Sequence, residues 1–161
     1  MRKIFAIIFA LIFIIALPAC SVDTHSDDYF GFSKHDFTVV EEQNTHGGFH
    51  GDGSYYLILD CSNNTENALK IVNGWNSLPL SENLDLIMFG GEKDGINYGY
   101  NLSEEAHIPE IENGYYCFRD RHSQAKDSSD DSELFGRSSF NFSLAIYDSD
   151  TNIFYYFEFD T

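Results

Sequence analysis

Apolar and polar side chains alternate along the last part of the chain, and this pattern limits the possible folds more than any other feature. Residues 138–147 and residues 153–159 each place an apolar or aromatic side chain at every second position on one face. A period of two is typical of β-strands, whose successive side chains point to opposite faces. The polar residues 148–152 between the two segments predict a turn, so we expect an antiparallel hairpin.

Several shorter segments also have strand character. Residues 37–42, residues 55–60 and residues 115–119 are short runs rich in β-branched and aromatic side chains. We predict a further strand at the apolar run 84–89, with residues 97–101 as the returning strand of a second hairpin. Most connections are too short for the crossover helices of a parallel sheet. The pattern therefore predicts an α+β fold with a mainly antiparallel sheet of about six or seven strands.

One segment has the apolar spacing of a helix that packs on this sheet. In residues 63–74 the apolar side chains recur three and four positions apart. Asn63 and Glu66 have the spacing of a capping box at its start, and Gly74 is a typical residue for its end. Residues 103–107 are expected to form one further helical turn. We predict one packed helix.

The charge balance of the chain is strongly acidic. Its 161 residues include 26 Asp and Glu but only 9 Lys and Arg, a formal net charge of −17. Hydrophobic residues make up 43%, which is typical of a packed domain and too high for a disordered chain. The charge excludes nucleic acid as a partner, because binding a phosphate backbone requires clustered Lys and Arg. It favours a basic protein or peptide instead.

The first residues have the pattern of a signal peptide. Arg2 and Lys3 precede an unbroken apolar run over residues 4–17. A helix of this length spans about 21 Å, which is less than the roughly 30 Å of a bilayer core. A positive start followed by a short apolar run is typical of export signals. The run ends in Leu-Pro-Ala-Cys at residues 17–20, which resembles the lipobox of bacterial lipoprotein precursors.

This resemblance implies a lipid anchor at Cys20. In that family the cysteine thiol receives a diacylglycerol, the signal peptide is removed before it, and the new amino group can take an acyl chain such as palmitate. We therefore expect residues 1–19 to be the signal peptide, residues 20–35 to be a lipidated polar tether, and residues 36–161 to be a single globular domain. The resemblance places the protein on the cell membrane or outer membrane, facing outside the cytoplasm. No other cofactor is implied.

A glycine-rich loop contains the candidate metal ligands. His46, His50 and Asp52 lie within seven residues, and two imidazoles with one carboxylate can bind Zn²⁺. The interspersed glycines argue against a helix here, so a ligand-contacting loop without metal and a solvated loop remain alternatives. The acidic run 127–133 offers oxygen ligands for weak Ca²⁺ binding, or is simply a solvated charged loop.

Two cysteines remain if Cys20 is lipidated. Cys61 and Cys117 form a possible disulfide, because cysteine pairs are common outside the cytoplasm. Each lies in or just after a predicted strand, so a bridge requires those two strands to be adjacent. A catalytic cysteine would need a histidine partner, which the sequence alone cannot place.

Paired tyrosines recur in the predicted strands. Tyr55 and Tyr56, and likewise Tyr115 and Tyr116, are a possible face for a sugar or peptide ligand, since Tyr combines an apolar ring with a polar tip. Neighbouring residues on a strand point to opposite faces, so at most one of each pair can line a given surface. The alternative is that these rings cover the edges of the core.

The sequence contains none of the stronger catalytic signatures. It has no G-x-S-x-G nucleophile turn, no phosphate loop and no dinucleotide-binding fingerprint. The leading hypothesis is therefore a lipid-anchored extracytoplasmic binding domain without catalysis. One concrete form is an immunity or inhibitor protein that recognises a basic protein. The alternatives are a small metal-dependent hydrolase that uses the His/Asp loop, and a carbohydrate-binding module of the cell envelope.

Overall fold

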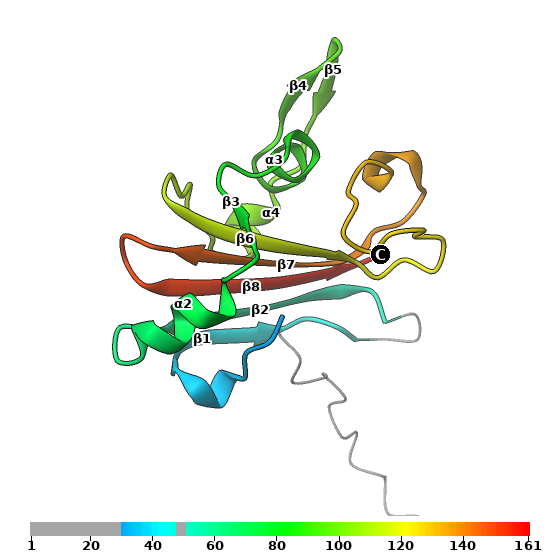
Figure 1. The fold of residues 1–161 in the computed structure, drawn as a ribbon. Helices are drawn as coiled ribbons and strands as arrows, with labels where there is room; N and C mark the ends of the chain where they lie inside the picture. The colour runs from blue at the N-terminus through cyan, green and yellow to red at the C-terminus, as the bar shows by residue number, and fades with distance from the viewer. Residues whose placement is uncertain (1–29, 48–50) are drawn as a thin grey trace, which may run out of the picture.

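A six-stranded antiparallel sheet forms the centre of the computed structural model, which describes residues 30–47 and 51–161 (Figure 1). The strand order is β1-β2-β8-β7-β6-β3, and every neighbouring pair is antiparallel. The strands are β1 (Thr38–Asn44), β2 (Gly53–Asp60), β3 (Asn76–Ser77), β6 (Gly114–Asp120), β7 (Asn141–Asp148) and β8 (Ile153–Asp160). The predicted α+β class with a mainly antiparallel sheet is confirmed.

The C-terminal hairpin lies in the middle of the sheet. β7 and β8 pair from Asn141 with Asp160 to Asp148 with Ile153. In the turn between them, the Asp148 carboxylate accepts hydrogen bonds from the backbone of Asp150 and the hydroxyl of Thr151. β2 and β6 then flank the hairpin, so its regular alternation defines both faces of the sheet.

Short elements cover both faces of the sheet (Figure 1). On one face lie α3 (Glu82–Phe89) and α4 (Leu102–Glu105), with the hairpin of β4 (Gly91–Lys93) and β5 (Ile96–Tyr98) extending away from the body. On the other face lie α2 (Thr65–Ile71) and the 3-10 turn η1 (Lys34–Asp36). A second 3-10 turn, η2 (Leu134–Gly136), belongs to the loop between β6 and β7.

The sheet therefore separates two hydrophobic cores. The core under α3 and α4 contains buried side chains from the helices and from alternate strand positions, among them Leu84, Ile87, Phe142, Leu144 and Phe157. The core under α2 contains the intervening strand positions, Ala68 of α2 and Val72, which directly follows that helix. A sheet covered on both faces explains why the strands carry apolar side chains on both faces.

The prediction of a strand at residues 84–89 is wrong, because this segment forms α3. Ser81 caps the helix, since its hydroxyl accepts a hydrogen bond from the backbone of Leu84 at 3.3 Å. Gly90 ends it at a φ of 76°, a conformation that glycine adopts readily. A short apolar run has no decisive period, so the cap and the terminal glycine were the informative signals.

The other predicted helices and the second hairpin are confirmed in part. α2 forms inside residues 63–74, but its N-cap is Asn64 and no side-chain cap hydrogen bond is present, so the capping box predicted from Asn63 and Glu66 is wrong. α4 is the expected helical turn. A hairpin does form near residues 97–101, but it pairs β4 with β5 across a turn at Asp94.

The folded part of the chain begins earlier than the predicted boundary at residue 36. The ring of Phe32 is buried and stacks on Phe154 with a centroid distance of 4.9 Å. The ring of Phe30 lies edge-on to Trp75, and its centroid is 4.8 Å from the guanidinium carbon of Arg119. The last residues of the predicted polar tether thus pack on the core under α2.

A candidate binding cleft beside helix α3

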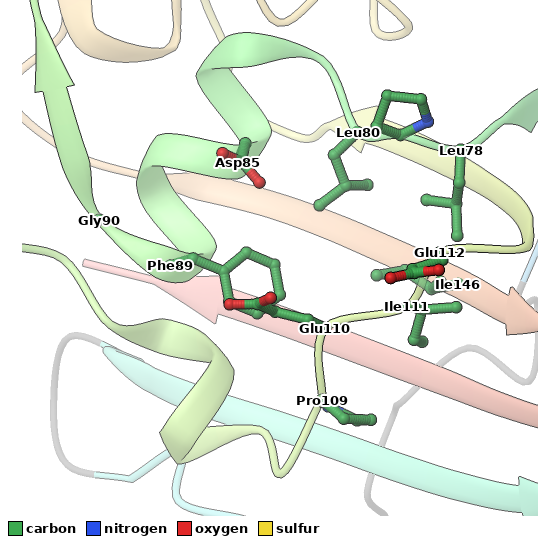
Figure 2. A pocket seen from close by; sticks show the side chains of 11 residues that line it. Leu78, Leu80, Asp85, Phe89, Gly90, Pro109, Glu110, Ile111, Glu112 and Ile146 are labelled. Atoms are coloured by element: carbon green, nitrogen blue, oxygen red, sulfur yellow. The ribbon is translucent and has the colours of Figure 1, made fainter.

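An open cleft lies beside α3, and we call it the α3 cleft (Figure 2). Its volume is about 780 Å³, within the range of small-molecule and peptide side-chain pockets. Apolar side chains from Leu78, Leu80, Phe89, Ile111 and Ile146 and acidic side chains from Asp85, Glu110 and Glu112 line it, together with two prolines and Gly90.

One wall of the cleft is the exposed side of α3. Asp85 and Phe89 are four residues apart, so they project from the same side of the helix toward the cleft (Figure 2). The opposite side of α3 buries Leu84, Ile87 and Met88 in the core. This amphipathic arrangement fixes the rotation of the helix and therefore the direction of the Asp85 carboxylate.

Polar contacts with the loop after β6 hold the start of α3 in place. The hydroxyl of Ser81 donates a hydrogen bond to the carboxylate of Asp131. The Asn83 side-chain amide donates to the Asp131 carbonyl at 3.0 Å. The ammonium group of Lys93 in β4 donates a hydrogen bond to the side-chain oxygen of Asn83 at 3.0 Å and forms an ion pair with Glu82 at 2.8 Å. The wall that carries Asp85 is thus tied to two neighbouring elements.

The opposite wall is the segment 109–112, which connects α4 to β6. Ile108, just before it, is buried, and its backbone donates to the Ser103 carbonyl at 2.9 Å. At its far end Gly114 begins β6 and accepts a hydrogen bond from the backbone of Leu78 at 3.0 Å. This bond joins the two chain segments that border the cleft, while Ile146 of β7 lines the cleft from the sheet.

The charge of the cleft is one-sided. Three carboxylates line it, and none of the described lining residues is Lys, Arg or His. Burial raises the pKa of Asp85 above its ordinary value of 3.8, and the negative charge of Glu110 raises it further. An apolar surface next to like-charged acids is suited to a ligand that is both cationic and apolar.

The metal prediction falls partly outside the described residues, since His50 is not among them. His46 lies between two oxygen partners, with Nε2 at 2.8 Å from Asp160 and Nδ1 at 3.0 Å from Asn44. Asp52 is exposed. Among residues 30–47 and 51–161 no three His, Cys, Asp or Glu side chains are grouped as a metal site. The site at His46, His50 and Asp52 stays a prediction.

The possible disulfide between Cys61 and Cys117 is not formed, and both residues are free thiols. Cys61 directly follows β2 and Cys117 lies in β6, and two strands, β8 and β7, separate β2 from β6. Neighbouring strands are about 4.8 Å apart, so the separation exceeds the reach of a disulfide. Burial raises the pKa of the Cys61 thiol to about 12.

The possible tyrosine face is not present as an exposed surface. Tyr55 and Tyr56 are each 2% exposed and belong to the two different cores. Burial and a hydrogen bond to Glu41 raise the pKa of Tyr56 to about 12. Tyr115 and Tyr116 are half-buried and pack against opposite cores. The expectation that each pair is divided between two faces is confirmed.

The lipidation prediction lies outside the described residues, because Cys20 and the apolar run before it are not among them. Within residues 30–47 and 51–161, no helix has the length and apolarity needed to cross a membrane.

Sequence reasoning missed the α3 cleft. Its residues come from three segments that are distant in sequence, and a local motif cannot report such a convergence. The one local signal was Asp85, a charged residue inside an otherwise apolar run. The chain matches no protein-family model, no curated protein and no solved structure, so its function is inferred from its own residues.

Proposed function

We propose that the protein is a lipid-anchored, extracytoplasmic interaction domain that binds a basic protein or peptide and performs no catalysis. The observation that carries this proposal is the α3 cleft, in which three carboxylates border an apolar surface. The excess of acidic residues, 26 against 9 basic ones, supports the proposal as well, because a negatively charged protein attracts a basic partner over a long range.

An immunity or inhibitor role is the concrete form of this proposal. A domain tethered by a lipid on Cys20 would meet basic toxins or lytic enzymes at the cell surface. The acidic domain would be repelled by anionic lipid headgroups and would stand away from the bilayer with its cleft accessible. Two acyl chains would make the attachment stable.

The proposal predicts salt-sensitive binding of basic peptides. We would array blocked octapeptides of four classes, namely basic with apolar residues, basic with polar residues, acidic with apolar residues, and uncharged apolar. The full chain, labelled and held in non-ionic detergent, should bind the class that is both basic and apolar. We expect the affinity to fall about ten-fold between about 50 mM and about 500 mM NaCl, because salt screens the charge interaction.

The other classes serve as controls in the same measurement. The acidic peptides have the same apolar content and should not bind at either salt concentration. Equal binding of the basic and acidic classes, or no binding of any basic peptide, would contradict the proposed function.

A further inference from the structure

We infer that the α3 cleft binds a Lys or Arg side chain flanked by apolar residues, with the cationic group held between Asp85 and Glu110. This inference rests on the proposed function and specifies its ligand. The occupant is a segment of a basic partner protein, whose charged head meets the two carboxylates while its apolar neighbours contact Leu80, Phe89 and Ile111.

The two carboxylates come from two different segments that line the cleft. Asp85 projects from α3, and Glu110 belongs to the segment 109–112 on the other side of the cleft (Figure 2). A cation between them neutralises two negative charges at once and removes their mutual repulsion. Both residues are exposed at the cleft, and the charge of Glu110 acts on Asp85, so the place between them favours a cation.

No side-chain partner of these acids is found among the residues that the structure describes. Neither Asp85 nor Glu110 forms an ion pair with any described Lys, Arg or His. Glu82, one turn before Asp85 on the same helix, is paired with Lys93 at 2.8 Å. Within residues 30–47 and 51–161, Asp85 and Glu110 are thus available to an external cation.

The apolar lining distinguishes a basic side chain from a simple cation. The aliphatic stem of Lys or Arg can lie along apolar surface while its head remains at the carboxylates. Leu78, Leu80 and Ile111 are half-buried and already pack on the core, so they present a preformed apolar surface. The volume of about 780 Å³ accommodates more than one side chain.

Charge excludes two other occupants. A second copy of this chain would carry the same net charge of −17, and anionic lipid headgroups are also negative, so both would be repelled by the cleft. A small polyamine would match the charge but leave the apolar lining exposed to water. A basic, apolar polypeptide segment satisfies both properties of the site.

The test uses the tightest basic peptide from the array and the full chain. The double variant Asp85→Asn/Glu110→Gln should lower its affinity about ten-fold, since two charge contacts are lost. The matched double variant Glu92→Gln/Glu104→Gln removes two exposed carboxylates outside the cleft and should change affinity less than two-fold. The double cleft variant should unfold at the wild-type temperature or above, because it removes repulsion.

A double-mutant cycle identifies the contact itself. Replacing the peptide's Lys or Arg by norleucine should weaken binding to the wild type about ten-fold but leave binding to Asp85→Asn/Glu110→Gln nearly unchanged. Equal loss in the cleft variant and the matched variant would overturn the inference while leaving the proposed function standing. Absence of binding by every basic peptide would remove the proposed function itself. Spermidine is cationic but lacks the apolar flanks of the peptide. If it displaced the peptide completely and bound the cleft as tightly as the peptide does, the inference would also be overturned.

The site also predicts a specific pH dependence. The pKa of Asp85 is raised, so as the pH falls this carboxylate takes up a proton before an ordinary aspartate would. The other titratable groups that line the cleft are Glu110 and Glu112. Peptide affinity should therefore decrease in this window. Without bound peptide, Asp85 of the folded protein takes up a proton more readily than Asp85 of the unfolded chain does. Protonation of this group therefore makes the peptide-free protein more stable as the pH falls.

The two pH effects should have opposite signs and a common origin. Isothermal titration and thermal unfolding over the same pH series would measure them. In Asp85→Asn both slopes should be smaller than in the wild type. A peptide affinity that increases toward acidic pH would contradict a carboxylate-bound cation.

Discussion

Gly114→Ala should destabilise the fold by about 3 kcal/mol, near the upper end of the range for overpacking. A β-carbon on Gly114 would overlap the carbonyl oxygen of Tyr147 on the neighbouring strand β7. Backbone atoms cannot rotate away as a side chain can, so β6 and β7 would have to separate at this point. The unfolding temperature should fall by about 10 °C, as measured by circular dichroism.

Gly99→Ala is the matched control for this prediction. A β-carbon on Gly99 meets no atom within 4 Å, and its φ lies outside the left-handed region. The change should alter stability by less than about 0.5 kcal/mol, as exposed substitutions usually do. Equal stability of the two variants would show that β6 does not run this close to β7.

The effect at Gly114 should extend to the α3 cleft. Gly114 accepts the backbone hydrogen bond of Leu78, and the added β-carbon would also approach the Leu78 side chain at 3.3 Å. A shift of β6 would thus move the segments that border the cleft. Any folded fraction of the variant should bind the basic peptide more weakly than the wild type.

Phe157→Ala should cost about 3–5 kcal/mol, the usual range for removing a buried aromatic ring. Phe157 is 0% exposed and lies on β8 in the middle of the sheet. Its ring contacts Phe142 and Phe159, with a centroid distance of 6.2 Å to each. The loss would be a large part of the stability of a typical domain, so urea unfolding should show a much lower midpoint.

Two other variants make this measurement specific. Phe157→Leu keeps most of the apolar volume and should cost less than about 1.5 kcal/mol. Ile96→Ala removes an apolar side chain that is 57% exposed on β5, and it should have little effect. A small effect of Phe157→Ala would mean that the core between the sheet and α3 is not packed around this ring.

The C-terminal hairpin shows which parts of the fold local sequence can predict. Apolar and polar side chains alternate regularly in residues 138–147 and 153–159. This period predicted two strands, the sheet face to which each side chain points, and the turn between the strands. β7 and β8 form this hairpin. The sheet face to which a side chain points follows from its position in the strand, so it can be predicted without knowing any contact with distant residues. The divided placement of Tyr55 and Tyr56 followed for the same reason.

Residues 84–89 show where local reasoning ends. Their apolar side chains suit a buried strand as well as a buried helix, and only the cap at Ser81 and the end at Gly90 favour the helix. The wrong prediction also concealed the cleft, because Asp85 and Phe89 project from the same side only on a helix.

The sequence alone was sufficient for the fold class, the central hairpin, the acidic character and the resemblance of residues 17–20 to a lipobox. Those properties depend on composition and on spacing within single segments. Only the tertiary structure decided that Cys61 and Cys117 are separated by two strands and that Asp85 and Glu110 face one cleft. The order of strands in a sheet and the meeting of distant loops depend on packing of the whole chain, which no local period records.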